Sequence, residues 1–319
     1  MVDTRYVRIL VTNDDGIDSE GIIWLATAMA DHGEVTLVAP DREYSGASAS
    51  LGVLNEIRPE VRRARIEGVE DAWTVSGPPA LCVMFATLGV FDRSFDLVVS
   101  GINPGVNVGR SVYHSGTVGA ALTARSRGLP AIAVSQAVEG YGIEGQGWDE
   151  MLKGVHWEAA AQVAGAVVGG IAGHGILAPM VVNLNVPNMP LAEMAGWERT
   201  VIGRVPPRVI ADARLEPHEG RAGSFKVVME WGDAVSLPEG TDGGAVERDR
   251  VSLTLLGHLS TSTPRPTGRP SSRSTRPWYG PSTGCSPAPE PTAVRRLRPA
   301  RPRPAPGPGR RPAPGWTPH

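Results

Sequence analysis

The stretch Ile9-Leu10-Val11-Thr12-Asn13-Asp14-Asp15-Gly16-Ile17-Asp18 decides the fold of this chain. It begins with a short aliphatic, β-branched run that is typical of a buried strand. Neighbouring strand residues point to opposite faces, so Asp14 and Asp15 converge only if the backbone turns, as Gly16 permits. An open α/β sheet binds its ligand at the carboxyl ends of its strands. The stretch therefore predicts a metal site, with an ordinary Asp/Gly turn as the alternative.

The composition is that of a protein with a sizeable core. The chain has 319 residues, of which 41% are hydrophobic. We find no run near the ~20 apolar residues of a membrane span and no secretory signal pattern. The two cysteines, Cys82 and Cys285, are too few for a disulfide framework. We therefore expect a cytoplasmic protein with no membrane partner.

The last 56 residues differ from the rest. Residues 264–319 hold 16 of the 29 prolines and 11 arginines against one acidic residue, Glu290. This composition cannot form a packed core, so we expect a disordered Arg/Pro-rich tail after a domain of residues 1–263. One hypothesis is a frameshifted reading of a GC-rich gene, and a genuine disordered tail is the alternative. The remaining 263 residues hold 20 basic and 32 acidic residues, so we expect nucleic-acid binding only through the tail, if at all.

Predicted strands and helices alternate over the first 190 residues. Further strands are expected at 35–39, 96–100, 131–135 and 180–186, and helices near 20–32, 79–88, 117–127 and 158–169. This alternation predicts an α/β core of about residues 5–190 with a mostly parallel sheet. Residues 55–75 indicate an antiparallel excursion. Short β-like runs over 198–256 indicate a smaller, β-rich C-terminal extension of about residues 191–260.

Three polar loops follow predicted parallel strands and so lie at one edge of the sheet. They are residues 13–18, 41–48 and 101–110. The Asp14 and Asp15 carboxylates, the Ser45 hydroxyl and the Asn103 amide oxygen are hard oxygen donors, which suit Mg²⁺, Mn²⁺ or Ca²⁺. Taken singly, each loop has a purely structural explanation.

Ser115-Gly116-Thr117 stands at the start of an Ala-rich helix. Free N–H groups and the positive end of the helix dipole would make an anion pocket there. Plain N-capping by Ser115 or Thr117 is the alternative, and both can hold at once. His114 beside this pocket is either a proton donor or a packing or surface residue.

Taken together, four motifs resemble the SurE family of metal-dependent nucleotidases. They are Val11-Thr12-Asn13-Asp14-Asp15-Gly16, Ala39-Pro40-Asp41-Arg42 with Ser45-Gly46-Ala47-Ser48, Ser100-Gly101-Ile102-Asn103-Pro104-Gly105-Val106-Asn107, and Tyr113-His114-Ser115-Gly116-Thr117-Val118. Asn183-Leu184-Asn185-Val186-Pro187 and Thr241-Asp242 look like later landmarks of that family. The resemblance covers residues 5–256; the chain departs from it at Gly77-Pro78-Pro79-Ala80-Leu81-Cys82 and in the long tail.

The resemblance implies a Rossmann-like sheet with helices on both faces, a β-rich extension used in subunit exchange, and a homodimer or homotetramer. It implies one divalent metal ion (Mg, Mn or Ca) on Asp14, Asp15, Ser45 and Asn103, with Asn107, Ser115, Gly116 and Thr117 at the substrate phosphate. The implied activity is hydrolysis of nucleoside 5'-monophosphates, with 3'-monophosphates left open. Asp14 and Asp15 would be the catalytic pair, and metal-activated water is favoured over a phospho-aspartate. A nucleotide- or metal-binding protein with little or no turnover is the alternative.

Overall fold

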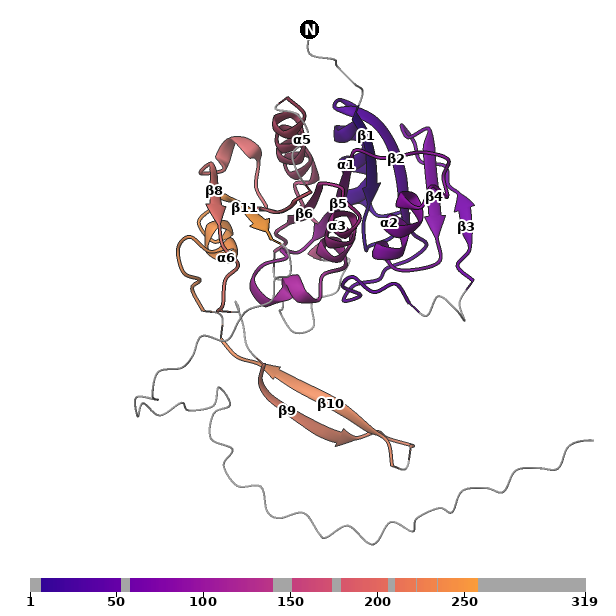
Figure 1. The fold of residues 1–319 in the computed structure, drawn as a ribbon. Coiled ribbons are helices and arrows are strands. Elements are labelled where there is room, and N and C mark those ends of the chain that lie inside the picture. Colours follow the sequence, from indigo (N-terminus) through magenta and orange to yellow (C-terminus); the bar gives the residue numbers. More distant parts are fainter. Residues whose placement is uncertain are drawn as a thin grey trace, which may run out of the picture. The chain divides into compact units, whose positions relative to one another are not determined.

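Figure 1 shows the chain as a computed structural model. The structure describes residues 7–52, 58–139, 151–173, 179–205, 210–221, 223–233 and 235–257. The expected tail, residues 264–319, lies outside the described residues, as does part of the expected excursion over 55–75. The division of the chain into a domain and a tail therefore stays a prediction.

A nine-stranded sheet in the order β3-β4-β2-β1-β5-β6-β7-β11-β8 forms the centre of the described chain (Figure 1). Its strands are β1 (Val7–Thr12), β2 (Gly33–Pro40), β3 (Val61–Arg63), β4 (Asp71–Val75), β5 (Leu97–Pro104), β6 (Ala131–Gln136), β7 (Val181–Val186), β8 (Trp197–Thr200) and β11 (Val251–Leu256). The strands from β4 to β7 in this order all run parallel. Their carboxyl ends therefore share one edge, which confirms the mostly parallel α/β sheet.

Helices cover both faces of this sheet, as the burial of consecutive β1 residues, which point to opposite faces, requires. The longer ones are α1 (Glu20–Ala30), α2 (Pro79–Thr87), α3 (Gly116–Ser126) and α5 (Trp157–Gly173), with shorter turns at η1 (Gly109–Tyr113), η2 (Leu191–Glu193) and α6 (Asp242–Val246). Ile9 and Val11 pack with α1 and α5 in one core. Leu10 packs with α2 and α3 in the second. These two cores fix the position of the sheet, whose carboxyl edge carries the three polar loops.

Two pairings with the main sheet go beyond the predicted topology. Within the excursion, β3 and β4 are antiparallel to each other, but β4 joins the main sheet parallel to β2. In the extension, β11 joins the main sheet antiparallel to β7, and β8 pairs with β11. An alternating pattern reveals a half-buried strand but not its partner, so these long-range pairings could not be read from the sequence.

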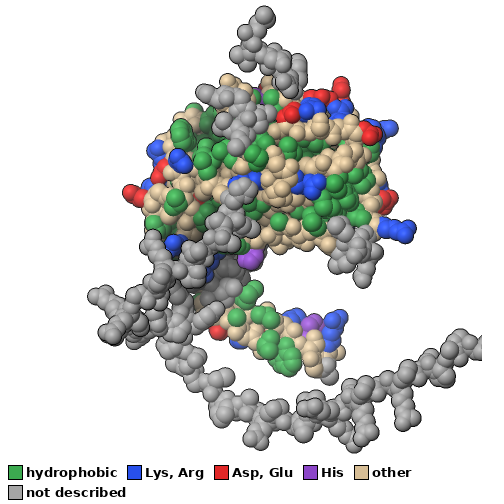
Figure 2. Space-filling model, viewed as in Figure 1, with side chains coloured by type: hydrophobic (Ala, Val, Ile, Leu, Met, Phe, Trp, Pro, Cys, Tyr) green, Lys and Arg blue, Asp and Glu red, His purple; other side chains and the backbone are tan. Residues whose placement is uncertain are grey.

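Strands β9 (Ile210–Pro217) and β10 (Phe225–Trp231) form a separate antiparallel hairpin, which confirms a smaller β-rich element late in the chain. Its register places Leu215 opposite Val227 and Pro217 opposite Phe225 on one face. Figure 2 shows hydrophobic side chains exposed on this hairpin. Among the helices of the described residues, none is long and apolar enough to cross a bilayer.

Candidate functional site

Asp14 lies just beyond β1 and is held by the start of α3. Its carboxylate is buried, and Thr117 donates a hydrogen bond from Oγ1 to Oδ1 over 2.5 Å. Burial raises the pKa of Asp14, while the Thr117 hydroxyl and the N–H groups of Thr117 and Gly116 counteract that shift. The carboxylate is therefore anchored in one orientation, with its charge partly offset by a helix N-terminus.

Asp15 is adjacent to Asp14 in sequence, but its carboxylate lacks the hydrogen bonds that anchor Asp14. Both of its carboxylate oxygens are buried, and neither has a hydrogen-bond partner among the described residues. Burial raises the pKa of Asp15 well above the ordinary carboxyl value, and the charges of Asp14 and Glu43 raise it further. A buried carboxylate without donors is costly unless a cation balances it.

A cleft of about 340 Å³ opens beside Asp15 and makes this carboxylate reachable. Glu43 lines it from the second polar loop, and Ile102 and Pro104 line it from β5. The three loops therefore meet at one crevice at the carboxyl edge of the sheet, as expected.

The turn after β1 is fixed by a residue to which the sequence pattern assigned no role. Gly16 adopts a φ of 100°, as the predicted turn requires. Asn13 donates from Nδ2 to the Gly16 carbonyl over 2.9 Å and to Ser19 Oγ over 2.7 Å. Asparagine in a polar turn is common enough that only these contacts show its part in shaping the carboxylate pair.

The second loop is bound to the first and to the start of α3. The Tyr44 N–H donates to the Asp14 carbonyl over 2.7 Å, and the Ser48 N–H donates to the His114 carbonyl over 3.1 Å. Ser45 is exposed and donates from Oγ to Glu43 Oε1 over 2.7 Å. Ser45 therefore lies next to the cleft through Glu43, which lines it, but Ser45 itself is not among the lining residues.

Asn103 contributes from the end of β5. Its Nδ2 donates to the Gly105 carbonyl over 2.6 Å, which uses the donor end of the amide and leaves the oxygen end for a ligand. The residues on either side of Asn103 line the cleft beside Asp15.

Asn107 is buried within a cluster of polar side chains. Its N–H donates to Asn185 Oδ1 over 2.7 Å, and its Nδ2 donates to Ser135 Oγ over 2.8 Å. Asn183 donates from Nδ2 to the Asn107 carbonyl over 2.8 Å. The sequence pattern pointed to Asn183 and Asn185 only as landmarks; two polar residues in a six-residue buried strand were the signal for a shared role.

The start of α3 supports both interpretations of its sequence. Ser115 Oγ accepts from the Val118 N–H over 3.1 Å and is thus an N-cap. Thr117 does not cap the helix but binds Asp14. A Cβ on Gly116 would lie 2.7 Å from Asp14 Oδ2, so only glycine fits here. His114 is exposed.

The donor set at this crevice consists of hard oxygens. Nowhere among the described residues do three His, Cys, Asp or Glu side chains gather in a metal-binding group. A metal at Asp14 and Asp15 would thus rely on hydroxyl, amide, water or substrate oxygens for its remaining ligands. Cys82 is buried in the core, where burial raises the pKa of its thiol.

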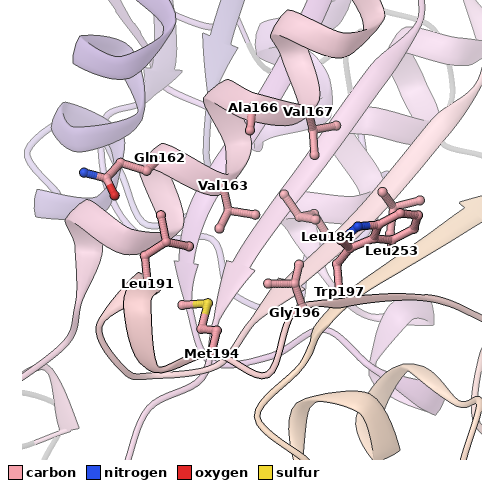
Figure 3. Close-up of a pocket in the computed structure, with 11 residues that line it drawn as sticks. Gln162, Val163, Ala166, Val167, Leu184, Leu191, Met194, Gly196, Trp197 and Leu253 are labelled. Atoms are coloured by element: carbon pink, nitrogen blue, oxygen red, sulfur yellow. The ribbon is translucent and has the colours of Figure 1, made fainter.

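A larger apolar pocket of about 370 Å³ lies away from the carboxylates (Figure 3). Residues of α5, η2, β8 and β11 surround it, among them Val163, Leu191 and Trp197. None of the eight predicted site residues lines this pocket. Its lining offers little chemistry, so the crevice at Asp15 is the candidate active site.

Comparisons with known proteins show the family of this chain. Residues 9–207 match the family model described as survival protein SurE. The 5'-nucleotidase SurE of Haemophilus ducreyi is 38% identical over 251 residues, covering 78% of this chain and 93% of that protein. The 5'-nucleotidase SurE of Histophilus somni is 36% identical over 250 residues, covering 78% and 92%.

A solved structure supports the same relationship. The SurE protein from Aquifex aeolicus superposes with a TM-score of 0.64 at 31% identity, covering 79% of this chain and 94% of that chain. The resemblance inferred from the four motifs is thereby confirmed, and this chain belongs to the survival protein SurE family.

Proposed function

We propose that this chain is a divalent-metal-dependent phosphomonoesterase that hydrolyses nucleoside 5'-monophosphates to nucleoside and phosphate. The relatives named 5'-nucleotidase SurE support the nucleotidase activity. One observation carries the site: Asp15 presents two buried oxygens without a donor, beside the fixed carboxylate of Asp14.

The residues present fit a hard divalent cation. The pKa values of the adjacent Asp14 and Asp15 carboxyls are both raised. A positive charge between them would stabilise the ionised form of both side chains. We propose Asp14, Asp15, Ser45 and Asn103 as the residues that hold it, with Mg²⁺, Mn²⁺ or Ca²⁺ as candidates. When bound, such a cation neutralises charge on the phosphoryl oxygens and lowers the pKa of a bound water.

The chain's own residues would do the rest. Asp14, held by Thr117, keeps the donor set in one geometry. Asp15 would accept a proton from the attacking water at one of its two carboxylate oxygens, neither of which has a hydrogen-bond partner among the described residues. We propose that Ser115, Gly116 and Thr117 contact the phosphate, because they stand at the N-terminus of α3. We propose Asn107 as a further contact, because it follows β5 at the carboxyl edge of the sheet. The same helix N-terminus binds the Asp14 carboxylate.

The test is a hydrolysis assay with AMP, GMP and a generic aryl phosphate. We expect turnover with added Mn²⁺ or Mg²⁺ and none with EDTA. Asp14→Asn should abolish it, and Asp31→Asn, the same change at an exposed position at the end of α1, should not. If the chain binds nucleotides but turns over none of them with any of the metals, the proposed enzymatic activity is refuted and a binding protein is favoured.

We also propose that the chain forms a homodimer or homotetramer through its hairpin. Leu215, Phe225 and Val227 are 66%, 56% and 63% exposed and share one face of β9–β10. A two-stranded hairpin is marginal alone, so an apolar face of this kind requires a partner surface. A cytoplasmic location and the disordered tail stay predictions from the sequence.

A further inference from the structure

The loop after β5 is fixed on one side by β6 and β7. The N–H and the carbonyl of Asn107 are both bound by asparagine side chains of β7, Asn185 and Asn183. The side chain of Asn107 is tied to Ser135 of β6. The backbone of this residue therefore has no freedom to shift along the sheet edge while these bonds persist.

Asp242, at the start of α6, fixes the same loop from the other side. Its carboxylate is 1% exposed and accepts three main-chain hydrogen bonds. Oδ2 accepts from the Gly109 N–H over 2.8 Å. Oδ1 accepts from the Gly203 N–H over 2.8 Å and from the Gly243 N–H over 2.9 Å. Bonds of this kind, from N–H groups to a charged acceptor, are about twice as strong as neutral ones.

These contacts link distant parts of the chain at the site. Asp242 lies 133 residues from Gly109, and Asn185 lies 78 residues from Asn107. Neither Asp242 nor Asn185 is among the residues that we place on metal or phosphate. Asn185 binds the backbone of Asn107, and Asp242 binds the backbone of Gly109, two residues further along the same loop.

We propose that Asp242 and Asn185 are positioning residues for phosphate hydrolysis, which set Asn107 at the substrate phosphate. This inference rests on the proposed function. A donor misplaced by about 1 Å can cost two orders of magnitude in rate, and supporting residues of this kind typically contribute about 10- to 100-fold.

Asp242→Asn is the first test. The amide keeps the shape of the carboxylate but turns one acceptor into a donor, so at least one of the three N–H groups loses its partner. In the full-length chain with Mn²⁺, kcat/KM for AMP should fall about 10- to 100-fold. Inhibition by inorganic phosphate should weaken as well, because the loop would hold the phosphate less well.

Asp71→Asn is the matched control. Asp71 is another well-packed carboxylate, which accepts from Trp73 Nε1 over 2.9 Å and pairs with Arg93 over 3.1 Å. It stands on β4, near the other end of the sheet from α6. We expect this variant to lose stability while kcat/KM and phosphate inhibition stay close to wild type.

A double-mutant cycle separates positioning from general destabilisation. If Asp242 acts through Asn107, then Asn107→Ala with Asp242→Asn should be no slower than Asn107→Ala alone. Asn185→Asp, which keeps the acceptor for the Asn107 N–H but loses its donor, should behave in the same way. It also provides the cycle if Asp242→Asn does not fold.

The outcomes divide cleanly. Losses that multiply in the cycle, or an unchanged kcat/KM in both variants, would overturn the positioning role and leave the proposed function intact. A wild-type chain that hydrolyses no nucleotide with any metal would refute the proposed function, and this inference with it.

Discussion

Replacing Asp15 with asparagine should make the metal-free chain more stable while it abolishes hydrolysis. The Asp15 carboxylate is buried without a hydrogen-bond donor, and burial, Asp14 and Glu43 together raise its pKa well above the ordinary carboxyl value. The amide has nearly the same volume but carries no charge. It also brings an N–H₂ group beside the Asp14 carboxylate.

The magnitude follows from the cost of a buried unsatisfied group. That cost is about 1–3 kcal/mol, and a chain of this size gains roughly 2–4 °C in Tm per kcal/mol. We therefore expect the Tm of Asp15→Asn in EDTA to exceed that of wild type by about 2 to 12 °C.

The pH dependence of stability independently gives the sign of the difference between Asp15→Asn and wild type. Because the folded state raises the pKa of Asp15, it holds a proton more tightly than the unfolded state does. The metal-free wild type therefore loses stability as pH rises from the ordinary carboxyl pKa through the raised one. Asp15→Asn lacks this loss, so its advantage should be absent in acid and grow as pH rises through the raised pKa.

Thermal unfolding in EDTA, at neutral and at acid pH, measures this difference. A second series with Mn²⁺ should raise the Tm of wild type, because a ligand of the native state stabilises it, and should not raise that of Asp15→Asn. Asp18→Asn, exposed in the same loop, should stay within about 0.5 kcal/mol of wild type. The reasoning fails if Asp15→Asn is no more stable than wild type in EDTA, or if Mn²⁺ stabilises both equally.

Three further changes test the surroundings of this pair. Thr117→Val removes the hydroxyl that binds Asp14; kcat should fall about tenfold with the fold retained by circular dichroism, and an unchanged kcat would count against that role. Gly116→Ala places a methyl group 2.7 Å from Asp14 Oδ2, so metal-dependent activity should be lost, which a fully active variant would contradict. Val227→Glu charges the apolar face of the hairpin, so light scattering should show smaller assemblies, whereas Val228→Glu on the opposite face should not; equal masses for both would argue against this interface.

Much of the fold was accessible from the sequence because its signals are local. The aliphatic run ending at Asp14 and Asp15 and the alternation of strand and helix patterns predicted a parallel sheet with loops at one edge. Strand periodicity and turn residues act within a few positions of the chain. The same local logic identified the Ser115 cap, whereas Ser45 and Asn103 as hard-oxygen donors stay predictions.

Only the tertiary structure decided which residues share an environment. No local pattern distinguishes Asp14, anchored by Thr117, from Asp15, which has no donor. The pairing of β11 with β7 and the carboxylate of Asp242 on the Gly109 N–H likewise join segments far apart in the chain. Burial and electrostatic coupling depend on such long-range contacts, so the chemistry of the two carboxylates became distinct only once the chain was folded.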